Sequence, residues 1–209
     1  GRTDEGSRPW QLLDGSFPGL SPSLHLDGDT VYAAYREDGE TTVLKWEEDA
    51  WVPVGERKFS VGNGYEPEIV VDGQVPYVAY SAQDGSALVV KFDGENWVMV
   101  GDALSTEDPH HFSMAVHEGI PYVAYVESRD AGESWYLGAM KVKRLSVEGD
   151  PSGEWTAMGD FSLFTNVRSN TVMLRYDGDR HLFVSFRDET NDSTHLYRWD
   201  LQGEEPAWQ

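Results

Sequence analysis

The sequence contains no cysteine, which excludes disulfide bonds, thiolate nucleophiles and cysteine-ligated zinc. Cations are also scarce, because 16 Lys and Arg stand against 37 Asp and Glu, for a formal net charge of −21. Phosphate backbones and anionic lipid surfaces need a cationic face, and no cluster of Lys and Arg interrupts the acidic average. We therefore expect no nucleic-acid partner and no binding to anionic membranes.

Long apolar runs are missing as well. No stretch of 18 or more apolar residues occurs, so membrane insertion is not expected, and "GRTDEGSRPW" is not a signal peptide. What the chain does have is 39% hydrophobic and 12% aromatic residues, which suits a globular protein with a packed core rather than a disordered one.

A short apolar motif recurs along the chain. "PYVAY" stands at Pro76–Tyr80 and again at Pro121–Tyr125, with the variants "VYAAY" at Val31–Tyr35 and "LFVSF" at Leu182–Phe186. Apolar residues at consecutive positions indicate a strand that is covered on both faces. Each motif follows a run that ends in a glycine turn ("SLHLDG", "EIVVDG", "SMAVHEG", "VMLRYDG"), which predicts a tight hairpin.

Three units end in a Trp-x-x-x-Gly strand, written "WVPVG", "WVMVG" and "WTAMG". Trp10, Trp51, Trp97, Trp155 and Trp208 are separated by 41, 46, 58 and 53 residues. Such spacing is typical of repeated four-stranded units that bury their faces against one another, as in a β-propeller. A β-sandwich is the rival fold, but it does not require a Trp-Gly strand at the end of every unit.

From about Trp10 to Trp208 the pattern resembles the "pYVAY … W-x-x-x-G" blades of bacterial exported β-propeller repeat proteins. The resemblance implies an all-β propeller of four-stranded antiparallel blades and an extracellular or cell-envelope location, and it implies no specific function. We expect one domain over residues 1–209 with four blades, approximately 22–55, 67–101, 112–159 and 170–200, the last closed by residues 10–13.

Ring closure leaves alternatives, because "EPAWQ" near the C-terminus competes with "RPWQLL" for one place. One explanation is that the chain was cut from a longer array at equivalent points. A second is that the C-terminal segment caps the edge, and a third is that copies of the chain associate through unpaired strand edges. We expect a monomer or an edge-mediated homo-oligomer.

The loops between the second and third strands of each unit are acidic. A ring of carboxylates around a channel mouth is a weak candidate for Ca²⁺, although Asp and Asn are also good turn formers. No contiguous calcium-loop motif is present, and no other cofactor is expected. The candidate positions are Asp38, Asp84, Asp130 and Asp188.

The loops that link one blade to the next differ from one another, as recognition loops do. Aromatic rings beside polar groups stack on sugars while the polar groups bind hydroxyls; the alternative is that these rings pack between blades. The candidate ligand-binding residues are Phe59, Asn63, Tyr65, His110, His111, Phe164, Asn166 and Arg168.

Catalytic motifs are missing from the sequence. It has neither the sialidase "S-x-D-x-G-x-T-W" box nor a G-x-S-x-G nucleophile elbow, and we assign no catalytic residue. The favoured function is a non-catalytic binding or scaffold module whose ligand, a glycan or a protein surface, meets the blade-linking loops. The alternative is a carbohydrate-active hydrolase with carboxylates at the central funnel.

Overall fold

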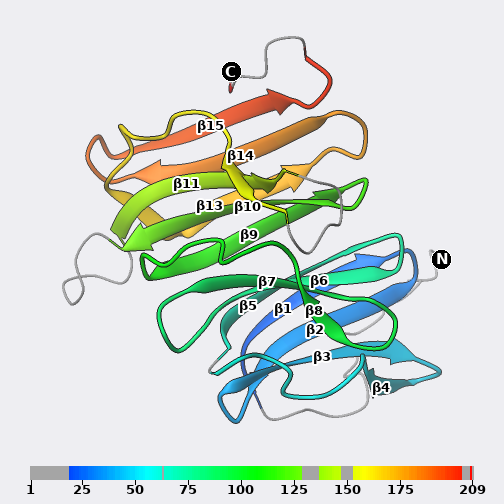
Figure 1. Cartoon of the computed structure of the whole chain (residues 1–209). Coiled ribbons are helices and arrows are strands. Elements are labelled where there is room, and N and C mark those ends of the chain that lie inside the picture. Colours follow the sequence, from blue (N-terminus) through cyan, green and yellow to red (C-terminus); the bar gives the residue numbers. More distant parts are fainter. Residues whose placement is uncertain (1–18, 63, 129–136, 147–152, 204–207, 209) are drawn as a thin grey trace, which may run out of the picture.

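The computed structural model describes residues 19–62, 64–128, 137–146, 153–203 and 208. All the strands in this part of the chain pair antiparallel, and they form sheets that lie one after another along the molecule (Figure 1). We call each set of consecutive strands that are joined by hairpins a blade. The all-β, antiparallel architecture expected from the repeats is confirmed.

The blades follow the order of the sequence. The strands of blade 1 are β1 (Leu20–Asp27), β2 (Thr30–Glu37), β3 (Glu40–Glu47) and β4 (Ala50–Pro53). Those of blade 2 are β5 (Tyr65–Asp72), β6 (Val75–Ser81), β7 (Ala87–Phe92) and β8 (Trp97–Met99). Those of blade 3 are β9 (Pro109–His117), β10 (Ile120–Ser128), β11 (Leu137–Leu145) and β12 (Trp155–Ala157). Those of blade 4 are β13 (Val167–Tyr176), β14 (His181–Asp188) and β15 (Ser193–Asp200).

Blades 3 and 4 are joined by a short ladder between β11 and β13, so that their strands form one hydrogen-bonded sheet. The ladder consists of Leu137 opposite Arg168 and Gly138 opposite Val167. On its other side Gly138 lies close to β10, where a Cβ would come 2.0 Å from the carbonyl oxygen of Glu127.

The repeated apolar motif is the second strand of each blade, as its composition predicts. Ala34, Ala79 and Ala124 are fully buried at its centre, where a small side chain lets the neighbouring sheet approach closely. Tyr80 and Tyr125 are fully buried beside them. The motif is therefore a structural element of the blade interior.

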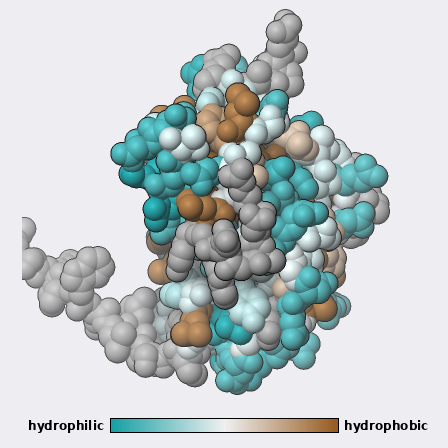
Figure 2. Space-filling model, turned by 90° about the vertical axis from the view of Figure 1, so that its left-hand side faces the viewer, coloured by the Kyte–Doolittle hydropathy of each residue, from teal (hydrophilic) through white to brown (hydrophobic). Residues whose placement is uncertain are grey.

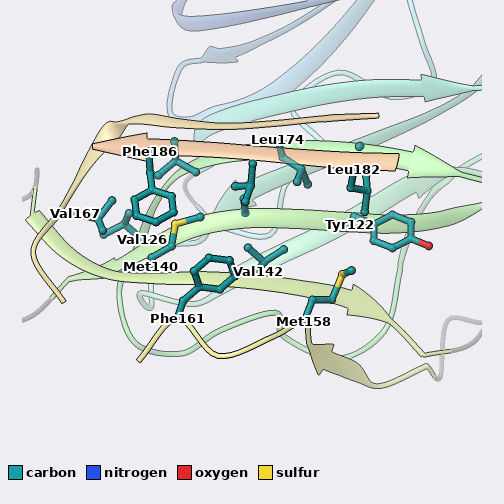
Figure 3. Packing of buried hydrophobic residues seen from close by; sticks show 14 residues of the cluster. Tyr122, Val126, Met140, Val142, Met158, Phe161, Val167, Leu174, Leu182 and Phe186 are labelled. Carbon is teal, nitrogen blue, oxygen red and sulfur yellow. The ribbon is translucent and has the colours of Figure 1, made fainter. Parts of the chain in front are cut away.

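The hydrophobic core lies between successive blades as three clusters. In the cluster between blades 3 and 4, side chains of β10 and β11 point toward those of β13 and β14, with Phe161 and Met158 closing one side (Figure 3). The exterior is different: on the face that Figure 2 shows, apolar surface is broken into separate patches between hydrophilic regions.

A tryptophan joins each of blades 2, 3 and 4 to the blade before it. Its indole N–H donates a hydrogen bond to a backbone carbonyl at the end of the preceding fourth strand: Trp97 to Val54 (3.0 Å), Trp155 to Asp102 (3.0 Å) and Trp208 to Met158 (2.8 Å). The glycine of the Trp-x-x-x-Gly motif makes room for that indole. A Cβ there would come within 3.2 Å of the indole Nε1 at Gly55, 3.0 Å at Gly101 and 2.9 Å at Gly159. Trp208 thus takes in blade 4 the place that Trp97 and Trp155 take in blades 2 and 3.

The innermost strands lie in sequence around an axis. β1 packs against β5, β5 against β9 and β9 against β13, whereas no extensive contact joins β13 to β1 among the described residues. Residues 10–13, which we expected to close the last blade, lie outside the described part. Their closing role and the count of four blades therefore stay predictions. Within the described chain, no helix is long and apolar enough to span a membrane.

Candidate functional site

A hollow of ≈ 290 Å³ opens at the end of the axial channel where the innermost strands begin. We call it the mouth hollow. Its lining comes from all four blades and is mainly polar, with Ser21 and Ser23 from β1, Glu66 and Glu68 from β5, His111 from β9, and Ser169 and Asn170 from β13.

A β-bulge places one residue of each of the first three blades at this mouth. Ser21, Glu66 and His111 have left-handed backbone angles (φ of 51°, 49° and 51°) next to register shifts in β1, β5 and β9. Non-glycine residues avoid this conformation at a cost of order 1–3 kcal/mol, and such strain gathers at functional sites. Its recurrence at one repeat position marks the mouth hollow as a candidate site.

Blades 2 and 3 hold Glu66 and His111 together across their boundary. The backbone N–H of His111 donates a hydrogen bond of 2.8 Å to Oε2 of Glu66, and Nδ1 of the same histidine lies 3.5 Å from that oxygen. One carboxylate oxygen is thereby fixed. Carboxylates of this kind orient the hydroxyl groups of a ligand in protein binding sites.

Tyr65 stands beside Glu66 at the start of β5 and is 39% exposed. The guanidinium carbon of Arg36, from blade 1, lies 4.1 Å from the centroid of its ring, which is a cation–π contact. The ring is therefore held at the rim by a neighbouring blade.

Glu68 lies deeper in the channel, where it lines both the mouth hollow and a second hollow at the opposite end. Ser23 Oγ donates a hydrogen bond of 2.7 Å to its Oε2, and the backbone N–H of Met114 also donates to this carboxyl. Burial raises the pKa of Glu68, against the opposing effects of these hydrogen bonds and of the charge on Arg175. A carboxyl group with a raised pKa can hold a proton closer to neutral pH than an exposed one does.

The second hollow, ≈ 540 Å³, is lined by the later parts of the same four strands. Arg175 borders it, and its Nη1 donates hydrogen bonds to the carbonyl of Leu174 (2.7 Å) and to Oγ of Ser113 (3.2 Å). His25 borders it too, and burial lowers the pKa of this imidazole. Leucines 24 and 26 give the hollow an apolar wall that the mouth hollow lacks.

The candidate ligand-binding residues separate into two groups. His111 lines the mouth hollow, whereas Tyr65 and His110 do not line it but directly precede the lining residues Glu66 and His111 in β5 and β9. Phe59 stacks on Trp97 (centroids 4.2 Å apart), and Phe164 packs on Phe186 and His195, so both rings are used in packing between elements. For these two rings, packing is therefore the role observed, which was the alternative to sugar binding considered from the sequence.

Two of the remaining candidates, Arg168 and Asn166, do not line the mouth hollow. Arg168 forms an ion pair with Glu189. Asn166 is half-buried, and its backbone carbonyl accepts a hydrogen bond of 3.0 Å from Glu189. Asn63 lies outside the described residues.

The four acidic positions considered for Ca²⁺ are engaged locally where they are described. Asp38 pairs with Lys58, Asp84 accepts hydrogen bonds from Ser86, and Asp188 accepts them from Thr190 and Asn191. Asp130 lies outside the described residues. In the part of the chain that the structure covers, no group of three His, Asp or Glu side chains is arranged to hold a metal ion.

Sequence reasoning missed Ser21, Glu66 and Glu68 as members of the site. Their signal is the proline that follows the bulge residue in "SPS" and "EPE", at Pro22 and Pro67. A proline near the start of a strand marks an edge or a bulge, because it cannot donate to the ladder. A search for prolines at one repeat position would have identified two of the three bulges.

No protein-family model and no curated protein matches the sequence. Solved structures do resemble the chain. A SapL1 lectin in complex with alpha methyl fucoside matches 93% of this chain and 64% of its own (TM-score 0.60, 18% identity). The exo-β-1,3-galactanase Pc1,3Gal43A of Phanerochaete chrysosporium, with β-1,3-galactotriose, matches 90% of this chain and 47% of its own (TM-score 0.54, 12% identity).

An endo-arabinase of Bacteroides thetaiotaomicron matches 93% of this chain and 80% of its own, with a TM-score of 0.52 and 14% identity. At these identities the likeness concerns the fold, which is a β-propeller. This chain spans about half the length of the galactanase and less than two thirds of the lectin.

Proposed function

We propose that this chain is a glycan-binding β-propeller module, without catalytic activity of its own, that holds its sugar in the mouth hollow. The observation that carries the proposal is the strained bulge repeated in three blades, which gathers hydroxyl, carboxylate and imidazole groups beside the exposed ring of Tyr65. A pyranose presents hydroxyl groups at its rim and an apolar C–H face. The lining offers partners for the hydroxyl groups, and Tyr65, next to Glu66 in β5, offers a ring for the C–H face.

The charge of the protein narrows the class of glycan. With a net charge of −21, the molecule repels uronic and sialic acids at long range, whereas a neutral sugar is not affected. We therefore propose a neutral glycan. The likeness to a lectin that binds a fucoside and to a galactanase that binds galactotriose supports the glycan class without selecting a sugar.

The test is binding to an array of neutral glycans, followed by calorimetry with the best ligand. Glu66→Gln and Asn170→Ala each remove one polar group of the hollow, and we expect each to raise Kd about 5–10-fold, since a hydrogen bond is worth about 1 kcal/mol. The control is Asn96→Ala, an exposed asparagine in the turn before β8. Unchanged affinity in both hollow variants would refute the site, and an array without any bound glycan would refute the function.

The second candidate function is a carbohydrate-active hydrolase, which Glu68 favours. A general acid needs a raised pKa and a second carboxyl group nearby, and Glu66, two residues away on the same strand, lies within about 7 Å at Cα. If this function holds, incubation with the array ligand releases new reducing ends, and Glu68→Gln abolishes the release while binding persists. A wild-type protein that binds glycan and releases nothing supports the binding module.

The other expectations from the sequence are proposals of the same kind. Calcium at the acidic loops predicts a rise in Tm when CaCl₂ is added after EDTA treatment. A protein surface is the alternative ligand for the blade-linking loops, and location outside the cell is expected from the resemblance alone. Light scattering would decide between a monomer and an edge-mediated homo-oligomer.

A further inference from the structure

The inner strand of blade 1 exposes a leucine at a position that every later blade buries. Leu24 lies opposite Ala33 in the β1–β2 ladder. The same register position holds Ile69, Met114 and Leu174 in the other three blades, opposite Val78, Val123 and Val184. These three side chains are 1%, 2% and 0% exposed beneath the preceding blade, whereas Leu24 is 64% exposed and Leu26, two residues on, is 67% exposed.

Blade 4 exposes the opposite kind of face. Leu196 lies opposite Ser185 in the β14–β15 ladder. The counterparts of Leu196 are Val43, Val89 and Val142, which lie opposite the buried alanines of blades 1, 2 and 3. They are 1%, 0% and 3% exposed because the following blade covers them, whereas Leu196 is 68% exposed. Met173, also opposite Ser185, is 50% exposed.

These two faces border one gap. Among the described residues, nothing covers blade 1 on its preceding side or blade 4 on its following side, and β1 and β13 make no extensive contact with each other. Both strands nevertheless line the same two axial hollows. We call the gap between them the seam.

The three junctions inside the molecule show what covers such faces. Each consists of the following-side face of one four-stranded sheet packed on the preceding-side face of the next. The seam presents one face of each kind, so it continues this established series of interfaces. Exposed large apolar side chains at positions that are buried in the other blades mark a site of association.

We propose that the seam binds one further four-stranded antiparallel sheet of the same repeat type, apolar on both faces. Its preceding-side face packs on Leu196 and Met173, and its following-side face packs on Leu24 and Leu26. A second copy of the whole chain does not fit, because docking its first blade on blade 4 places its second blade where blade 1 already stands.

The inner strand of blade 4 lacks a hydrogen-bond acceptor that the inner strands of blades 1, 2 and 3 use at their junctions with the following blade. Ser23 and Ser113 each accept a hydrogen bond from a backbone N–H of the following blade (Ile69 at 3.2 Å and Leu174 at 2.9 Å). Glu68 accepts one in the same way from Met114. Blade 4 has Met173 at this register position, and its flexible apolar side chain makes a packing contact in place of that hydrogen bond.

The experiment supplies the missing sheet by fusion. Residues 99–101 are repeated after Gln209, to extend the segment that begins at Trp208 into a Trp-x-x-x-Gly motif, and a copy of residues 56–101, which carries blade 2, follows them. Hydrogen–deuterium exchange then compares the fusion with the original chain. We expect slower exchange in β1, in β15 and in the added sheet, and weaker binding of the apolar dye ANS.

Two face variants and a matched control locate the effect. Leu24→Asp and Leu196→Asp in the fusion should each restore fast exchange in β1, in β15 and in the added sheet, whereas Leu163→Asp, at a leucine that is 89% exposed in a loop, should not. An added sheet that exchanges freely or is removed by protease while blades 1–4 persist would overturn the proposal. So would an original chain that binds no ANS and scatters light as a dimer, because a second copy would then cover the faces.

If the fusion does not fold, the face variants are made in the original chain. Each should abolish ANS binding there with Tm unchanged. A fall in Tm for either variant would mean that another segment, such as residues 1–18, already covers the seam, and the proposal would fail. None of these readouts depends on glycan binding, so they separate failure of the seam from failure of the proposed function.

Discussion

Gly55→Ala tests whether the Trp-x-x-x-Gly motif stabilises the protein through the junction between blades. Gly55 has φ of 67°, and a Cβ at this position would lie 2.5 Å from Cε2 of Phe92 and 3.2 Å from Nε1 of Trp97. The left-handed conformation costs an alanine about 1–2 kcal/mol, and forcing the two rings aside costs about 1–3 kcal/mol more. We therefore expect a loss of about 2–5 kcal/mol in the free energy of unfolding.

Gly73→Ala is the matched control, because Gly73 has φ of 55° and a Cβ there would meet nothing within 4 Å. It should lose only the conformational cost of about 1–2 kcal/mol. Urea unfolding followed by tryptophan fluorescence measures both variants against the wild type. Each kcal/mol should also lower Tm by about 2–4 °C. Equal losses in the two variants would refute the packing argument and leave only backbone strain.

Three further predictions concern other parts of the molecule. Glu68→Gln should stabilise the protein more and more, relative to the wild type, as pH rises above 4.5. The pKa of Glu68 is raised in the folded state, so its contribution to the free energy of unfolding is fully present below 4.5 and is lost as the carboxyl ionises at higher pH. Urea unfolding from pH 4 to 8 measures this, and a constant difference between variant and wild type would mean that the pKa is not raised. Ala79→Leu should cost roughly 1–3 kcal/mol by overpacking a position with no exposed surface, and an unchanged Tm would place Ala79 outside the blade interior. Deletion of residues 2–13 should lower Tm sharply if residues 10–13 complete a blade, whereas wild-type stability would assign closure to another segment.

The sequence predicts the strands of this protein well, because their signals are local. Consecutive apolar residues in "PYVAY" identified β6 and β10, and glycine turns identified the hairpins before them. The Trp-x-x-x-Gly strands appear as β4, β8 and β12. In each case hydrophobic pattern and turn chemistry agree, and such agreement between levels makes a prediction dependable.

The mouth hollow could not be predicted in the same way. It depends on left-handed backbone angles at Ser21, Glu66 and His111, and these residue types do not predict a left-handed conformation. The predicted aromatic residues do not form one site, for a related reason. A ring in a loop can face solvent or pack on the next blade, and the sequence does not show which of the two orientations the packing favours. Phe59 packs on Trp97, whereas Tyr65 remains at the rim.

The hairpin order within each blade also affects how the chain folds. Strands that pair within a blade are neighbours in sequence, so most ladders close short loops, and proteins rich in local pairs fold faster than other all-β proteins of the same size. Each sheet can then form before the next one docks, as in linear repeat proteins. We expect amide hydrogen exchange to be slowest in blades 2 and 3, which are covered by a blade on both sides. Blades 1 and 4 should open first, in steps too small to unfold the rest.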